Sequence, residues 1–81
     1  MLSIYELRPV DGRKSFYGKA LVHVEAETET LYSYNTPIIR RDRKTGKLTR
    51  LWWGWSATTG RHVAAFCGLN KAQYSALPVE A

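Results

Sequence analysis

The chain has 81 residues, with 12 Lys or Arg against 7 Asp or Glu, and so carries a formal net charge of +5. This length accommodates one domain over residues 1–81 with a modest core, and a hydrophobic content of 44% excludes low-complexity disorder. The single cysteine excludes an internal disulfide, and no apolar stretch approaches the roughly 20 residues that span a bilayer. The sequence therefore predicts a soluble cytoplasmic protein with an affinity for anionic partners.

The first half of the chain predicts antiparallel strands. Residues 2–8 are apolar and β-prone, and residues 9–12 follow as a turn containing Pro and Asp-Gly. Residues 16–25 alternate between mostly apolar positions and positions that include Lys19 and His23. This period of two is typical of a half-buried strand whose second side faces solvent.

Three alternating glutamates, Glu25, Glu27 and Glu29, interrupt this strand pattern and indicate a hairpin connection. Residues 30–36 are again strand-like. Pro37 follows, and because Pro lacks a backbone donor, we expect a bend or bulge there.

A second hairpin is predicted around residues 44–46, where Gly46 supplies a positive φ. The return strand spans residues 47–55. Alternation assigns four of its residues to the core face: Thr49, Leu51, Trp53 and Trp55. Trp52 is then expected beside Arg50 on the exposed face.

Two helices are expected in the last third of the chain. Ser56, or alternatively Thr58, caps the first helix, and Gly68 ends it. Its sheet-facing residues are Thr59, Val63, Phe66 and Cys67, with His62 at the margin. Asn70 and Gln73 resemble a capping box that opens a short second helix through Leu77. The predicted fold is α+β: three or four antiparallel strands, one main helix packed on the sheet, and a short C-terminal helix.

The second hairpin is the first candidate binding surface. Its members are Arg40, Arg41, Arg43, Lys44, Lys47, Arg50 and Trp52. Cations neutralise phosphates and indole rings stack on bases, so this composition suits a nucleic-acid, nucleotide or protein partner. The alternative interpretation is a solvated hairpin tip whose charges protect an edge, followed by tryptophans that fill the core.

The start of the first predicted helix is the second candidate, as a phosphate site. Free N–H groups at a helix start attract anions, and the neighbouring side chains add donors: Ser56, Thr58, Thr59, Arg61 and His62. The alternative is that the hydroxyls only cap the helix, that Gly60 packs against a tryptophan, and that His62 is an ordinary boundary residue.

No catalytic constellation emerges from the sequence. Cys67 and His62 lie about 140° apart around a helix, so they do not form a nucleophile–base pair, and a thiol on the apolar face is expected to be buried and inert. The two histidines and single cysteine give no metal-ligand cluster. We therefore expect a non-enzymatic protein without a cofactor or metal.

Three segments resemble, in this order, a family of small uncharacterised proteins from bacteriophages and prophages of gut Firmicutes: SFYGKA (15–20), LYSYNT (31–36) and WGWSATTGRHVAAF (53–66). The resemblance runs over roughly residues 15–67, and SATTGRH is its most specific part. The basic stretch at 40–50 is not part of this pattern. The resemblance implies a genomic setting, because the family carries no assigned activity.

A phage setting implies a stoichiometric inhibitor of host antiviral defence, acting in the cytoplasm of an infected or lysogenic bacterium. Its partner would be a host defence protein such as a CRISPR nuclease, or a nucleotide immune signal held between subunits of a homo-oligomer. One alternative is a nucleic-acid-binding phage accessory protein without an anti-defence role. A third possibility is a structural, oligomer-forming phage component. No membrane partner is expected.

Overall fold

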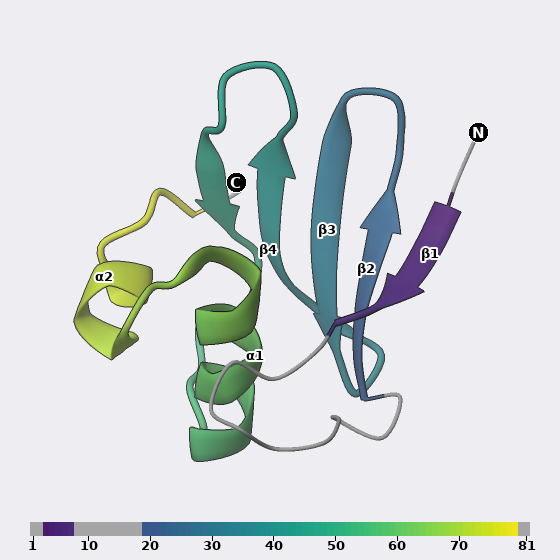
Figure 1. Ribbon diagram of the computed structural model, residues 1–81. Helices are drawn as coiled ribbons and strands as arrows, with labels where there is room; N and C mark the ends of the chain where they lie inside the picture. The colour runs from purple at the N-terminus through teal and green to yellow at the C-terminus, as the bar shows by residue number, and fades with distance from the viewer. Residues whose placement is uncertain (1–2, 8–18, 80–81) are drawn as a thin grey trace.

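The computed structural model describes residues 3–7 and 19–79. Its elements, in chain order, are β1 (Ser3–Glu6), β2 (Ala20–Val24), β3 (Thr28–Ser33), β4 (Thr36–Asp42), β5 (Leu48–Arg50), α1 (Ala57–Cys67) and α2 (Lys71–Ser75) (Figure 1). The turn predicted at residues 9–12 and the first part of the strand predicted from residue 16 lie outside the described residues.

The strands form a meander in which each strand pairs antiparallel with the next, in the order β1-β2-β3-β4-β5. The α+β class, the main helix and the short C-terminal helix are confirmed. The predicted number of three or four strands is wrong, since the sheet has five. The predicted number of strands is too low partly because a tight turn just before Pro37 separates two full strands, β3 and β4.

This tight turn joins β3 to β4 through Tyr34 and Asn35, which have φ values of 52° and 72°. Ser33 pairs with Thr36 across it. Positive φ at both central residues is the type I′ geometry that fits the twist of a hairpin, and it usually selects Asn-Gly or Gly-Gly. Tyr in the first position and the absence of glycine do not indicate such a turn, which is why the sequence predicts a strand that continues to Thr36.

The irregularity expected at Pro37 is present as a break in the register of β3 and β4. Leu31 pairs with Ile39, whereas the next residue, Tyr32, pairs with Pro37. Ile38 is thus an extra residue in β4, as in a β-bulge. The break explains why two consecutive residues, Ile38 and Ile39, are both buried in the core.

The register divides the sheet into two different faces. On one face a row crosses all five strands: Tyr5, Val22, Leu31, Ile39 and Arg50. Its central residues pack with Val63 and Phe66 of α1 in the hydrophobic core. The opposite face has the row Ile4, His23, Thr30, Arg40 and Thr49, none of which is buried. The described helices therefore cover one face and leave the other uncovered.

Helix α1 begins and ends as predicted. The Ser56 side chain accepts a hydrogen bond from the N–H of Thr59, and Gly68 closes the helix in the left-handed conformation with φ 75°. The predicted apolar face is present, but His62 is fully buried instead of marginal. No described helix has both the length and the apolar character needed to cross a membrane.

Helix α2 opens with the predicted capping box of Asn70 and Gln73 and ends at Ser75, before Leu77. Its buried residue, Tyr74, directs its hydroxyl group to the carbonyl oxygens of Ile38 and Trp52. These two hydrogen bonds attach α2 to the sheet and to the segment that follows β5.

The return strand predicted over residues 47–55 is much shorter, because β5 ends at Arg50 and residues 51–56 form an irregular connection to α1. The two sides of this strand are exchanged relative to the prediction, since Arg50 lies in the core-facing row and Thr49 in the opposite row. The assignment is therefore wrong for Trp52 and Trp53 and right for Trp55. Trp53 is 85% exposed, whereas Trp52 and Trp55 pack against the core. A Cβ atom at Gly60 would lie 2.6 Å from the Trp55 ring, which confirms the alternative that Gly60 packs against a tryptophan.

The β3–β4 turn predicts the effect of replacing Asn35. Ala adopts positive φ less readily than Asn, so Asn35→Ala is expected to lower the free energy of unfolding by about 1 kcal/mol. Urea denaturation measures this change, and Asn35→Gly, which tolerates the same φ, is the matched control and should show no comparable loss. An Asn35→Ala protein as stable as the wild type would contradict the assigned turn geometry.

Candidate functional site

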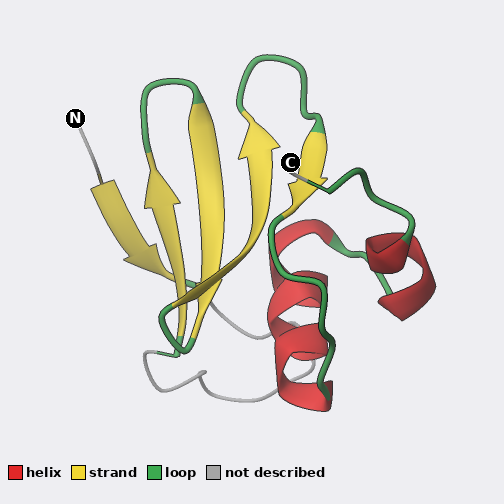
Figure 2. Cartoon of the chain, turned by 180° about the vertical axis from the view of Figure 1, so that it is seen from behind, coloured by secondary structure: helices red, strands yellow, loops and turns green. Residues whose placement is uncertain are grey.

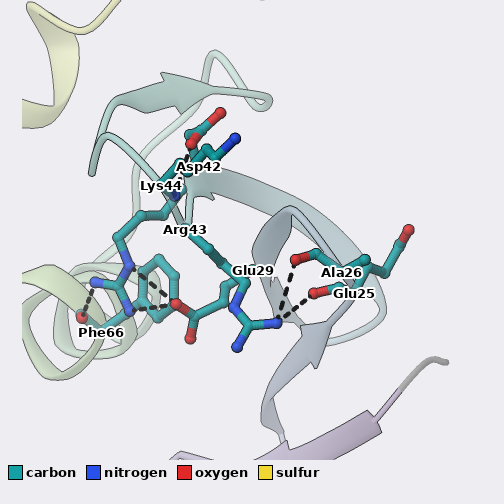
Figure 3. A network of polar contacts seen from close by, with 8 residues as sticks. Glu25, Ala26, Glu29, Asp42, Arg43, Lys44 and Phe66 are labelled. Carbon is teal, nitrogen blue, oxygen red and sulfur yellow. Dashed lines mark hydrogen bonds and ion pairs between the residues drawn. The ribbon is translucent and has the colours of Figure 1, made fainter.

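The residues of the predicted basic hairpin surface do not form one continuous surface in the structure. Arg41 is the first example. The Arg41 guanidinium lies 3.4 Å from a carboxylate oxygen of Glu29 and donates to the carbonyl of Phe66 at 3.3 Å (Figure 3). It also lies 4.3 Å from the centre of the Phe66 ring. Arg41 therefore fastens α1 to the sheet and is part of the structural framework.

Arg43 connects the tips of two hairpins. Its guanidinium donates to the carbonyl of Glu25 at 2.7 Å (Figure 3). Its backbone N–H donates to the carbonyl of Glu27 at 2.8 Å. An open hollow of about 390 Å³ lies between these tips, lined by Ala26, Glu27, Asp42, Arg43 and Lys44. Because both signs of charge line the hollow, it has no clear preference for anions.

Asp42 organises the turn between β4 and β5. Its carboxylate accepts hydrogen bonds from the backbone N–H groups of Lys44 at 2.8 Å and Thr45 at 3.0 Å. These donors, with that of Thr45 having the larger effect, lower the pKa of Asp42. The lysines of this loop, Lys44 and Lys47, have exposed side chains.

Arg50 and Trp52 are also engaged with the core side of the molecule. The Arg50 guanidinium lies 5.8 Å from the centre of the Tyr74 ring, and Trp52 packs against the core cluster. Trp52 is therefore not the exposed platform that the sequence predicted. Of the seven predicted hairpin residues, Arg41, Arg43, Arg50 and Trp52 have internal roles, while Arg40 lies on the uncovered face of the sheet.

Part of the predicted phosphate site at the start of α1 makes contacts within the protein. Ser56 caps the helix, and Thr59 and His62 are buried beneath Ser33 of β3. The Ser33 hydroxyl oxygen lies 2.8 Å from His62 Nδ1 and 3.4 Å from the Thr59 hydroxyl. Burial lowers the pKa of His62, which favours the neutral ring. Of the remaining predicted residues, Arg61 is exposed and Thr58 is half-buried.

LYSYNT and WGWSATTGRHVAAF meet near this buried network, together with Lys19 and Ala20, the described part of SFYGKA. The Lys19 ammonium group lies 5.2 Å from the centre of the Tyr34 ring, and that ring lies 6.0 Å from the His62 ring. The backbone N–H of Tyr34 also donates to the carbonyl of Lys19 at 3.0 Å. These contacts hold the positive-φ turn against α1, so shared structure accounts for much of the pattern in these segments.

The uncovered face of the sheet carries an aromatic pair that sequence reasoning did not assemble. The rings of His23 and Tyr32 stack with their centres 4.0 Å apart and their planes at 27°. Thr30 lies between His23 and Arg40 in the row that crosses the sheet. The alternating pattern of residues 16–25 predicts that His23 points away from the core. It does not predict that Tyr32 lies beside His23, because that depends on the β2–β3 register.

Trp53 is a separate aromatic group and is 85% exposed. Its neighbours hold the connection in place: Trp52 packs over Gly54, where a Cβ atom would lie 2.6 Å from its ring, and Trp55 packs over Gly60. The Trp52 carbonyl accepts a hydrogen bond from Tyr74. A rigid segment therefore presents one fully accessible indole. The sequence shows three nearly consecutive tryptophans but not which of them faces solvent.

The remaining candidates for chemistry have structural surroundings. The Cys67 thiol donates to the carbonyl of Val63 at 3.5 Å, and burial raises its pKa, so the reactive thiolate is disfavoured. Within residues 3–7 and 19–79, no three side chains of His, Cys, Asp or Glu come together in a way that could hold a metal ion.

The chain belongs to DUF8033, a family of unknown function, whose match covers residues 5–76. Neither a curated protein nor a solved structure matches the chain. The family membership thus spans nearly all the described elements, and the proposals for function rest on the residues themselves.

The buried His62 predicts a stability that falls on mild acidification. Its folded pKa is lowered, whereas a histidine in the unfolded chain titrates near about 6.5, so protons bind the unfolded state more readily. The free energy of unfolding should therefore decrease as the pH falls below about 6.5 and level off below the folded pKa. Urea denaturation between about pH 7.5 and 5.5 measures this loss, since carboxylates titrate mostly lower.

The matched variants are His62→Gln and His23→Gln. The first should flatten the pH dependence whatever its effect on absolute stability, while the second, at a half-buried position, should retain it. Equal slopes for wild type and His62→Gln would show that another group causes the loss.

Proposed function

We propose that this domain binds single-stranded nucleic acid on the uncovered face of its sheet and acts by binding alone, without catalysing a reaction. The observation that carries the proposal is the stacked pair of His23 and Tyr32 on that face. Exposed aromatic rings in a sheet stack on unpaired bases with little dependence on sequence, and such stacking contributes about 1–3 kcal/mol per base.

The charge distribution supports a phosphate-bearing ligand. Arg40 extends from the same face, two strands from His23, and Lys44 and Lys47 are exposed in the loop that continues β4. Asp42 and Glu27 are nearby acids, and the Asp42 carboxylate is engaged by two backbone donors of that loop. The net charge of +5 adds a long-range attraction for polyanions.

The test is fluorescence anisotropy with labelled single-stranded DNA and RNA at low and at physiological salt. Tyr32→Ala should weaken binding by about 5- to 150-fold, the equivalent of one lost base stack, whereas Tyr32→Phe should retain most of the affinity. Arg40→Gln should weaken binding to every sequence and reduce the salt slope by about one.

Lys71→Gln is the control for a general loss of charge, because Lys71 is exposed on α2, away from the sheet face. It should change affinity much less than Arg40→Gln. Absence of binding at low salt, or equal affinities for wild type, Tyr32→Ala and Arg40→Gln, would overturn the proposal. Unlabelled cyclic nucleotides in the same titration, as competitors, distinguish capture of a nucleotide signal from strand binding.

A second candidate function follows from Trp53. Trp is enriched at the centres of protein–protein interfaces, and an indole that is 85% exposed on a rigid segment is suited to enter a partner's pocket. We propose, as this alternative, that the protein is a phage-type inhibitor that captures a host defence protein, such as a CRISPR nuclease, in a stoichiometric complex. The phage setting is part of this proposal.

Co-elution with purified RNA-guided nucleases, together with their cleavage rates, tests this alternative. Trp53→Ala should abolish both complex formation and inhibition, while Tyr32→Ala should leave them intact. Because the Trp53 ring is so exposed, Trp53→Ala should keep the thermal stability of the wild type. Inhibition by Trp53→Ala equal to that of the wild type would contradict the assigned anchor.

A further inference from the structure

The two edge strands of the sheet, β5 and β1, have different surroundings. At the β5 edge, the N–H of Arg50 donates to the carbonyl of Pro78 at 2.8 Å, and Arg50 forms a parallel bridge with Val79. The C-terminal segment thus occupies that edge. At the other edge, all four residues of β1 are exposed, and no described segment pairs with its outer side. Figures 1 and 2 show β1 as the strand farthest from both helices.

The hydrogen-bonding direction of β1 follows from its neighbour Leu7, whose N–H donates to the carbonyl of Ala20 at 2.9 Å. In an antiparallel ladder, residues that bond to the partner strand alternate with residues that face away. Ser3 and Tyr5 therefore bond toward β2, while the N–H and C=O of Ile4 point outward from the sheet.

β1 has only some of the devices by which proteins usually block an open edge, namely a length of four residues and the charge of Glu6. Its four residues include no Pro and no Lys, and its register with β2 is unbroken. Ile4 is 53% and Tyr5 is 44% exposed, on opposite faces of the strand. A regular edge with apolar side chains on both faces favours the addition of another strand.

We infer that β1 pairs antiparallel with β1 of a second copy of this chain, around a two-fold axis at Ile4. In this register Ile4 opposes Ile4 of the partner subunit, and Ser3 opposes Tyr5 of the partner subunit. A register centred on Glu6 would set like charges opposite each other, which is destabilising. β1 contains no Lys or Arg, so two copies of a chain with net charge +5 meet at a strand without basic residues.

The dimer would double the surface assigned to nucleic acid. Ile4 ends the row that crosses the uncovered face through His23, Thr30 and Arg40. Pairing at Ile4 joins this row to its copy, so that two stacked His23–Tyr32 pairs lie on one continuous ten-stranded sheet. This use of the dimer rests on the proposed function, whereas the dimer itself depends only on the edge.

Sedimentation equilibrium over a range of protein concentrations, without nucleic acid, tests the pairing. The wild type should show a reversible monomer–dimer equilibrium. Ile4→Pro removes an N–H that points outward, a change that an edge strand tolerates, so it should remain folded by circular dichroism but stay monomeric. Ile4→Val should still dimerise. A wild type that is monomeric at all concentrations, or a folded Ile4→Pro protein that dimerises as well as the wild type, would overturn the inference.

Cross-linking tests the register even if Ile4→Pro fails to fold. In a Cys67→Ser background, one chain carries Ser3→Cys and another carries Tyr5→Cys. Opposed residues of this kind have Cα atoms about 4.5 Å apart, within reach of a disulfide. The mixture should form a covalent dimer under mild oxidation, and either chain alone should not. No covalent dimer in the mixture, or an equal yield from Tyr5→Cys alone, would overturn the stated pairing.

Separate variants test the dimer and the binding of nucleic acid. Tyr32→Ala and Arg40→Gln should weaken nucleic-acid binding without changing the dimerisation constant. Conversely, Ile4→Pro should lose more affinity for a strand long enough to reach both halves than for a short oligonucleotide. Equal loss for both oligonucleotide lengths would contradict the continuous surface.

Discussion

The placement of Tyr74 is the interaction on which much of this structure depends. Its hydroxyl reaches the carbonyl of Ile38, at the irregularity in β4, and the carbonyl of Trp52, beyond the end of β5. Its ring packs 5.3 Å from the Trp55 ring and beneath the Arg50 guanidinium. Tyr74, a buried side chain of the five-residue helix α2, thus connects this helix to the sheet and to the segment between β5 and α1. The same contacts leave Trp53 as the indole that faces solvent.

A second organising constraint is the use of cations in contacts within the protein. A basic composition suggests a broad attractive surface, yet Arg41 and Arg43 are bound to carboxylate or carbonyl oxygens, and Arg50 lies over an aromatic ring. Guanidinium groups suit these roles because they donate several hydrogen bonds and also stack on rings. Lys44 and Lys47 are exposed in the hairpin loop, and Arg40 lies in the row that crosses the uncovered face, so the functional proposal is placed on that face.

The outcome of sequence reasoning differed between local and long-range features. Helix boundaries were predictable because Ser56, Gly68 and the Asn70–Gln73 pair act through hydrogen bonds to their own neighbours. The assignment of Trp52 and Trp53 was wrong because alternation does not say which side of a strand faces the core, and Arg50, predicted to be exposed, lies in the core-facing row. The stacked His23–Tyr32 pair depends on the register of two strands, which no local pattern specifies. The buried Ser33–His62 contact joins residues far apart in the chain, so no local pattern specifies it either.

The glycine-free turn between β3 and β4 bears on the order in which the protein folds. Tyr34 and Asn35 must both adopt a backbone conformation with little intrinsic preference, so this hairpin has a weak local nucleus. The contacts that stabilise it come from Lys19 and from His62 on α1. We therefore expect the β3–β4 hairpin to become stable only after α1 has packed against it. The local structure of this hairpin then depends on a long-range contact. Such dependence raises the contact order and slows folding relative to a sheet built from autonomous hairpins.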